Sequence, residues 1–197
     1  MNQLFELHKK YGSVKVRDKY PYSHEYVTKI YPRYLHPLRD VPCSILEIGI
    51  AYGGALKAMR DYLTKAKIVG YDIKMDNIDY SNMERITLVQ GDQADEIMLT
   101  KIAKEHGQFD IIIDDACHLY EPQLKSLTTL WPFVKSGGFY IIEDVMKLKG
   151  KNGTAHNEIF NYIKQELLTV DAFAMKHHTG DIACIAFHNT LICLEKK

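Results

Sequence analysis

Residues 45–54 read ILEIGIAYGG, and this stretch decides the fold of the 197-residue chain. It begins as an apolar run that is typical of a buried strand, and its glycines lead into a helical pattern over residues 54–63. Glycines at such a junction allow a tight turn and a close approach of the backbone to a ligand. The stretch therefore predicts a strand, a ligand-binding turn and a helix.

The rest of the chain continues this alternation. Strands are predicted at 44–50, 67–72, 86–90, 109–115 and 139–144, helices at 54–63, 93–106, 120–134 and 156–168, and a closing antiparallel hairpin at 182–187 and 190–194. Alternating strands and helices with right-handed crossovers predict a doubly wound α/β fold. We expect a mostly parallel, Rossmann-like sheet of seven strands over residues 44–197, and a helical cap segment over residues 1–43.

Composition excludes several classes of protein. The formal net charge is zero, which disfavours a nucleic-acid partner. No apolar run is long enough to span a membrane, and the N-terminus lacks a signal-peptide pattern. The four cysteines form no C-x-x-C pair, so buried free thiols in a reducing compartment are expected. These features predict a cytoplasmic protein that uses neither nucleic acid nor a membrane, and a homo-oligomer is compatible with them.

The glycine turn does not suit a phosphate-bearing cofactor. It lacks the G-x-G-x-x-G spacing that brings a helix N-terminus to a pyrophosphate. Its leading acid, Glu47, suits the amino group of a bound amino acid. Asp72 follows the glycines by about 20 residues at a strand end, where a carboxylate can accept hydrogen bonds from a ribose. A cofactor with a ribose and a cationic amino-acid end, but without phosphate, is S-adenosylmethionine.

Acidic residues gather at the ends of two later strands. The first of these strands ends in Asp114 and Asp115, with His118 three residues on, and the next ends in Glu143 and Asp144. Neighbouring parallel strands would bring these carboxylates together, where they repel unless a cation such as Mg²⁺ is bound. A neutral imidazole can accept a hydroxyl proton near pH 7. Capping of the following loop is the alternative role for Asp114.

The chain resembles the class I S-adenosylmethionine-dependent methyltransferases over residues 44–144. The segments that carry the resemblance are ILEIGIAYGG, YD at 71–72, GD at 91–92 and LWPFVKSGG at 130–138. The resemblance implies that Gly49 and Gly53 line the methionine part of the cofactor, and that Asp92 with Gln93 lies near the adenine. Further candidate cofactor residues are Tyr52, within the turn, and Asp114.

The spacing D-D-x-x-H, followed by E-D, is similar to that of the metal-dependent sugar O-methyltransferases of the macrocin and rhamnosyl-tetracenomycin type and of cephalosporin-hydroxylase-like proteins. That resemblance implies Mg²⁺ ligands at Asp115, Glu143 and Asp144, and a base at His118. It also implies a substrate-binding motif, for which the candidates are Lys19, His24 and Tyr26; Tyr20 stands where that motif usually has glycine.

The sequence thus predicts a Mg²⁺-dependent O-methyltransferase that acts on a hydroxyl of a sugar or glycoside. Three alternatives remain open: a catechol-type O-methyltransferase, a dinucleotide oxidoreductase, and a non-catalytic adenosyl-binding protein on the same fold. Catechol-type enzymes usually have lysine at the position of His118, and the missing G-x-G-x-x-G disfavours the oxidoreductase.

Overall fold

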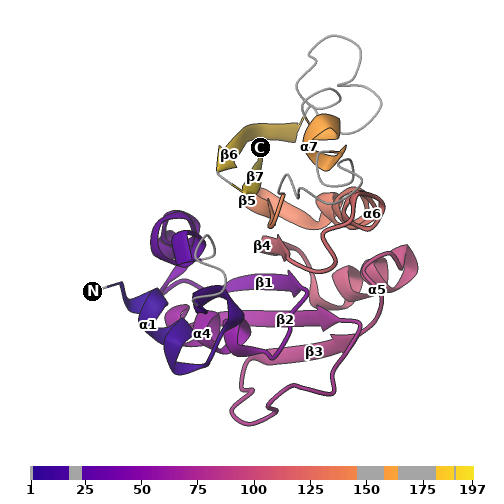
Figure 1. Ribbon diagram of the computed structural model, residues 1–197. Helices are drawn as coiled ribbons and strands as arrows, with labels where there is room; N and C mark the ends of the chain where they lie inside the picture. The colour runs from indigo at the N-terminus through magenta and orange to yellow at the C-terminus, as the bar shows by residue number, and fades with distance from the viewer. Residues whose placement is uncertain (1, 18–23, 146–157, 164–180, 189) are drawn as a thin grey trace, which may run out of the picture. The chain divides into compact units, whose positions relative to one another are not determined.

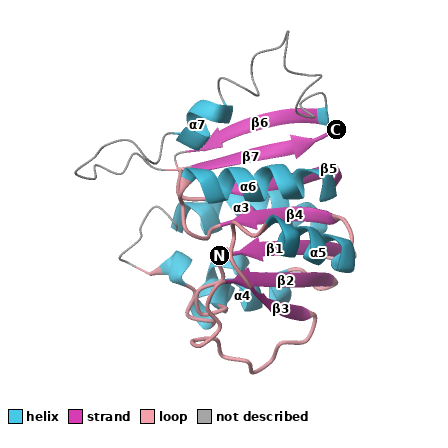
Figure 2. Cartoon of the chain, turned by 90° about the vertical axis from the view of Figure 1, so that its right-hand side faces the viewer, coloured by secondary structure: helices cyan, strands magenta, loops and turns pink. Residues whose placement is uncertain are grey.

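A computed structural model describes residues 2–17, 24–145, 158–163, 181–188 and 190–197 of the chain. Its strands form one mixed sheet in the order β3-β2-β1-β4-β5-β7-β6 (Figures 1 and 2). The predicted α/β class, with a mostly parallel seven-stranded sheet and a closing antiparallel hairpin, is confirmed. By its internal contacts the chain divides into two compact units, residues 1–92 and 93–197.

The first unit contains three parallel strands and a helix that packs on them. Strand β1 (Cys43–Ile48) pairs with β2 (Ala66–Asp72), which pairs with β3 (Ile86–Gln90). Helix α4 (Gly54–Tyr62) contacts β2 and β3. Nearly all of β1 is buried, which agrees with its unbroken apolar run.

The N-terminal elements pack within this first unit. They are α1 (Gln3–Lys10), the short helix η1 (Val14–Val16), the π-helix η2 (Tyr26–Ile30), α3 (Tyr31–Leu35) and η3 (His36–Leu38). Asn2 caps α1 by accepting a hydrogen bond from the backbone N–H of Phe5. Helix α1 lies beside α4 (Figure 1). The predicted division of the chain after residue 43 stays a prediction.

The second unit carries the remaining strands. Strand β4 (Phe109–Asp114) pairs in parallel with β5 (Val134–Ile142), and β5 pairs in antiparallel fashion with β7 (Leu191–Lys196), which pairs with β6 (Ile182–His188). Its helices are α5 (Glu96–His106), α6 (Tyr120–Leu130), η4 (Trp131–Phe133) and α7 (Glu158–Tyr162). Helix α6 contacts α5, α7 and β5, and in Figure 2 it lies in front of the strands of this unit.

Most predicted elements are present, with shifted ends. Helix α5 begins at Glu96 rather than 93 because Asp95 caps it, accepting hydrogen bonds from the N–H groups of Ile97 and Met98. Strand β5 begins at Val134, five residues before the prediction, so the glycines at 137 and 138 lie within the strand. The outer parts of the predicted helix at 156–168 lie outside the described residues.

The four cysteines are free thiols, as predicted. Cys43 and Cys193 are buried, whereas Cys117 and Cys184 are exposed, so burial was predicted correctly for only two of them. Among the described residues, no helix has the length and apolar character needed to cross a membrane.

A buried histidine makes the stability of the first unit depend on pH. His8 has no exposed surface, and burial, reinforced by the nearby charge of Lys15, lowers its pKa from 6.5 to about 3. Its Nδ1 lies 2.9 Å from Ser13 Oγ. The folded protein therefore keeps the ring neutral at pH values at which the unfolded chain binds a proton.

We predict that the free energy of unfolding falls as pH drops from about 6.5 towards 3, because the unfolded state binds more protons there. His8→Gln should flatten this dependence by up to about 1.4 kcal/mol per pH unit. Urea denaturation of both proteins between pH 7 and 4.5 measures the difference, with His36→Gln, a change at an exposed histidine, as the control. Parallel curves for wild type and His8→Gln would contradict the prediction.

Candidate functional site

The turn after β1 adopts the backbone expected of a ligand-binding glycine turn. Gly49 and Gly53 have φ values of 85° and 78°, in the left-handed region that favours glycine, and Ala51 joins them at 49°. The Gly49 N–H donates to the carbonyl of Tyr71, and the Gly53 N–H to that of Ile50. These two hydrogen bonds hold residues 49–53 in a tight turn directly after the end of β1.

Asp72 holds this turn through backbone hydrogen bonds. Its Oδ2 accepts from the N–H groups of Ile50, at 2.8 Å, and Ala51, at 3.2 Å. Its Oδ1 accepts from the N–H of Lys74 at 3.0 Å. A carboxylate offers about four acceptor positions, so three bonds still leave capacity for a ribose hydroxyl. The ribose contact stays a prediction, and the structure adds a second role for the same residue.

Glu47, the acid that begins the motif, is fully buried in β1 and forms an ion pair with a buried lysine. Lys15 Nζ lies 3.6 Å from Glu47 Oε1, and both side chains are 3% exposed or less. Burying two charges is costly unless they compensate one another. Sequence reasoning missed Lys15, because a lysine with a valine on each side carries no signal that its own side chain will be buried.

Two glycines near the turn are required by protein packing. A Cβ on Gly54 would lie 2.6 Å from the carbonyl oxygen of Tyr11, and one on Gly91 would overlap the hydroxyl group and the ring edge of Tyr71. The Tyr71 hydroxyl donates to the backbone carbonyl of Asp92. Asp92 itself is exposed. Packing against Tyr71 thus accounts for the glycine at position 91. The adenine role of Asp92 stays a prediction.

The other first-unit candidates lie in different surroundings. Tyr52 is half exposed, and the guanidinium of Arg17 lies 5.1 Å from its ring centroid. Tyr26 is buried beside Tyr31. His24 is partly buried, with its ring 5.7 Å from that of Phe5. Lys19 lies outside the described residues. The substrate role of Lys19, His24 and Tyr26 stays a prediction.

In the second unit, three predicted residues come together at the ends of β4 and β5. Each of Asp115, His118 and Asp144 offers one ligand atom, and these atoms lie within 4.8 Å of one another. His118 Nε2 is 3.6 Å from Asp144 Oδ2 and 4.0 Å from Asp115 Oδ1. All three side chains are partly exposed, between 15% and 31%, so the group is open to solvent.

Two residues of this group have unusual backbone conformations. His118 and Asp144 have φ values of 55° and 54°, which residues other than glycine adopt rarely and at a cost. The segment around Asp144 is anchored on both sides: the Glu143 N–H donates to the carbonyl of Asp114, and the Val145 N–H to that of Thr190. Such conformations gather at functional sites because the surrounding structure holds them there.

Glu143 is not part of this group of three. Its side chain is 1% exposed, in contrast to the partly exposed Asp144 that follows it. Its role as a metal ligand therefore stays a prediction. Adjacent residues at a strand end point to different sides, and the sequence alone did not indicate which of the two would face solvent.

Asp114 is fully buried and accepts hydrogen bonds from three side chains. Gln93 Nε2 donates to Oδ1 at 2.6 Å, Ser126 Oγ donates to Oδ2 at 2.5 Å, and the Tyr140 hydroxyl donates to Oδ2 at 3.1 Å. Burial raises the pKa of Asp114 to about 7 despite these donors, and burial also raises the pKa of Tyr140. The cofactor role of Asp114 stays a prediction, and no sequence signal singled out Ser126 or Tyr140.

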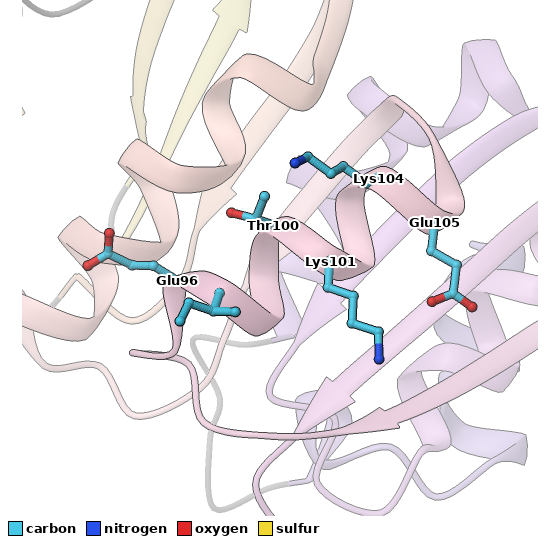
Figure 3. A pocket seen from close by; sticks show the side chains of 6 residues that line it. Glu96, Thr100, Lys101, Lys104 and Glu105 are labelled. Carbon is cyan, nitrogen blue, oxygen red and sulfur yellow. The ribbon is translucent and has the colours of Figure 1, made fainter.

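A shallow hollow lies elsewhere on the second unit, on the surface of α5. Figure 3 shows the side chains that line it, from Glu96, Ile97, Thr100, Lys101, Lys104 and Glu105. None of these residues belongs to the candidate site, and Ile97 is 85% exposed.

The glycine turn after β1 and the acidic residues after β4 and β5 lie where the sequence predicted them. A family model described as a methyltransferase domain matches residues 46–145, about half of the chain. The chain belongs to this methyltransferase family.

Among curated proteins, the chain is similar to the 8-demethyl-8-(2-methoxy-alpha-L-rhamnosyl)-tetracenomycin-C 3'-O-methyltransferase of Streptomyces olivaceus. The two are 38% identical over 136 residues, which make up 65% of this chain and 34% of that protein. The chain is 36% identical to the demethylmacrocin O-methyltransferase of Streptomyces fradiae over 130 residues, 62% of this chain and 32% of that protein. The predicted resemblance to this group is confirmed, and the matches span about a third of these relatives' own length.

Among solved structures, the chain is similar to the MycE methyltransferase of the mycinamycin biosynthetic pathway. The complex of that enzyme with Mg and S-adenosylhomocysteine gives a TM-score of 0.79 at 27% identity, over 98% of this chain and 54% of that one. A complex that also holds mycinamycin VI gives a TM-score of 0.81 at 24% identity, with the same coverage.

We predict that Lys15→Met lowers the free energy of unfolding by about 3–5 kcal/mol, because it removes the cation beside the buried carboxylate of Glu47. The double variant Lys15→Met/Glu47→Gln should recover most of that loss. Lys29→Met is the control, since Lys29 pairs with Glu25 at the surface, where an ion pair contributes at most about 1 kcal/mol. A loss for Lys15→Met no larger than that of the control, in urea denaturation, would refute the prediction.

Proposed function

We propose that this chain is a divalent-metal-dependent O-methyltransferase that transfers the methyl group of S-adenosylmethionine to a hydroxyl of a sugar or glycoside. The observation that carries the proposal is the gathering of Asp115, His118 and Asp144 within 4.8 Å. The curated relatives are sugar O-methyltransferases by name, and the MycE complexes hold Mg and S-adenosylhomocysteine. These comparisons support the same activity and donor for this chain.

The residues at the site fit a hard divalent cation. Asp115 and Asp144 bring two carboxylates close together, where their charges repel unless a cation offsets them. Both are partly exposed, so a cation there would keep positions for water and for an acceptor. Mg²⁺ suits this arrangement, because it takes oxygen ligands and usually keeps several waters. When bound, it would supply positive charge that favours loss of a proton from an acceptor hydroxyl.

Residues of the chain would accept the proton and bind the methyl donor. His118 would accept the hydroxyl proton at Nε2, the ring nitrogen that faces the two carboxylates. The acceptor oxygen then bonds to the methyl carbon as the bond from that carbon to the sulfonium sulfur breaks, which leaves S-adenosylhomocysteine. Glu47, Gly49, Gly53 and Asp72 are the proposed contacts of the methyl donor. Holding donor and acceptor in line can supply roughly 7–11 kcal/mol of the barrier.

The metal requirement gives a direct test of the activity. We expect methyl transfer from radiolabelled S-adenosylmethionine to a panel of methyl rhamnosides and other methyl glycosides, and we expect EDTA to abolish it and added Mg²⁺ to restore it. Catechol serves as the comparison acceptor. Transfer that persists in EDTA would remove the metal from the proposal, and transfer to catechol alone would replace the sugar by a catechol.

The proposed base gives a second test. His118→Ala should lower turnover by about 100-fold or more, because a positioned general base contributes about 10²–10⁴-fold. The dissociation constant for S-adenosylhomocysteine, measured by calorimetry, should stay unchanged. The control is His106→Ala, at the end of α5. Turnover of His118→Ala close to that of wild type would assign the base to another residue.

A further inference from the structure

We propose that Gln93 is a positioning residue for the metal site, which fixes the loop that carries Asp115 and His118 by tying it to the buried carboxylate of Asp114. The inference rests on the proposed function, because it assigns a role around the same metal. It differs from the adenine contact that the sequence predicted for Gln93. The hydrogen bonds of the Gln93 side-chain amide support this role.

Gln93 joins the end of β4 to the loop that follows it. Its Nε2 donates to Asp114 Oδ1 at 2.6 Å and lies 3.3 Å from Ser126 Oγ. Its Oε1 accepts from the backbone N–H of Cys117 at 3.3 Å and from the Cys117 thiol at 3.1 Å. The amide thus links Asp114, at one end of the loop, with the residue directly before His118.

These contacts use the full capacity of the amide. A glutamine side chain has two N–H donors and one carbonyl oxygen with two acceptor positions, and protein groups meet all four. The side chain is 6% exposed. A hydrogen bond from Gln93 to an adenine would therefore have to displace one of these partners, which favours a supporting role over a ligand contact.

The linked groups are held firmly at their other ends. Asp114 also accepts from Ser126, in α6, and from Tyr140, in β5. Asp114, Ser126 and Tyr140 have no exposed surface. Hydrogen bonds in such buried surroundings are strengthened, since water does not compete for the partners. Gln93 is therefore a bridge from a fixed buried network to a loop.

The loop is the part of the site that needs such support. Residues 115–119 belong to no helix or strand, yet they carry two of the three gathered side chains. His118 also has a left-handed backbone conformation, which persists only where neighbouring structure holds it. The bond from the Cys117 N–H to Gln93 restrains the peptide between Ala116 and Cys117, one residue before His118. Partners one step outside a metal's ligands orient those ligands in the same way at many metal sites.

The test measures binding of Mn²⁺, as a paramagnetic substitute for Mg²⁺, and of S-adenosylhomocysteine to the full chain, by electron paramagnetic resonance and calorimetry. Gln93→Met keeps the length of the side chain but removes all four contacts. We expect it to weaken Mn²⁺ binding by about 10–100-fold, and to leave the dissociation constant for S-adenosylhomocysteine within about twofold of wild type. Gln123→Met is the matched control, since Gln123 is equally buried and its amide nitrogen has no partner among the described residues.

A second variant serves in case Gln93→Met does not fold. Ser126→Ala removes one donor to Asp114 and one contact of Gln93, so Mn²⁺ binding should weaken in the same direction. Its control is Thr128→Val, an exposed position two residues on in the same helix. Circular dichroism confirms that each variant is folded before binding is measured.

The possible outcomes separate this inference from the proposed function. If wild type binds no Mn²⁺, the proposed metal dependence itself fails. If wild type binds Mn²⁺ and folded Gln93→Met binds it equally well, only the positioning role is overturned. Weaker binding of S-adenosylhomocysteine with unchanged Mn²⁺ binding would return Gln93 to the adenine site, and an equal loss of both would reduce its role to general stability.

Discussion

The parallel pairing of β4 with β5 is the constraint on which the candidate site depends. In their register Asp114 lies beside Ile142, and the pairing continues past the strands through the bond from the Glu143 N–H to the Asp114 carbonyl. The residues that follow, Asp115 and Asp144, are therefore brought to the same place. Two carboxylates held this close repel one another, and the proposed cation would offset that repulsion.

Each unit also contains a buried carboxyl group close in sequence to its candidate residues. In the first unit Glu47 is compensated by Lys15, and in the second Asp114 is compensated by three hydrogen-bond donors. Buried charges contribute little net stability compared with apolar side chains of the same volume. Glu47 lies in the strand that leads into the glycine turn, and Asp114 lies directly before the loop that carries Asp115 and His118.

The sequence predicted the fold class well because its main signals are local. The apolar runs at β1, β4 and β5 are buried as expected, and Gly49 and Gly53 adopt the left-handed conformations that the turn required. The convergence of Asp115, His118 and Asp144 also followed from the sequence, while their roles stay predictions. Strand ends of known order are enough to infer which residues converge. They are not enough to infer which carboxylate faces solvent, and so Glu143 and Asp144 could not be told apart.

What the sequence could not indicate is the set of contacts between distant residues. The sequence around Gln93 does not indicate that its side chain will hydrogen-bond to residues 21 and 24 positions later in the chain; the bonds from Gln93 to Asp114 and Cys117 form only once the chain has folded. The same holds for Lys15 and Glu47, and for Tyr71, whose ring explains why residue 91 is glycine. Each of these residues has an ordinary sequence environment. Their roles follow from packing, which a pattern along the chain does not record.

The central claim is that one divalent cation binds between the ends of β4 and β5. Crystals grown with Mn²⁺ and S-adenosylhomocysteine, measured with X-rays at the manganese absorption edge, test it most directly. The account predicts one strong anomalous peak in contact with the carboxylate oxygens of both Asp115 and Asp144. A fully occupied peak elsewhere, or bound S-adenosylhomocysteine with no peak between these two residues, would contradict it.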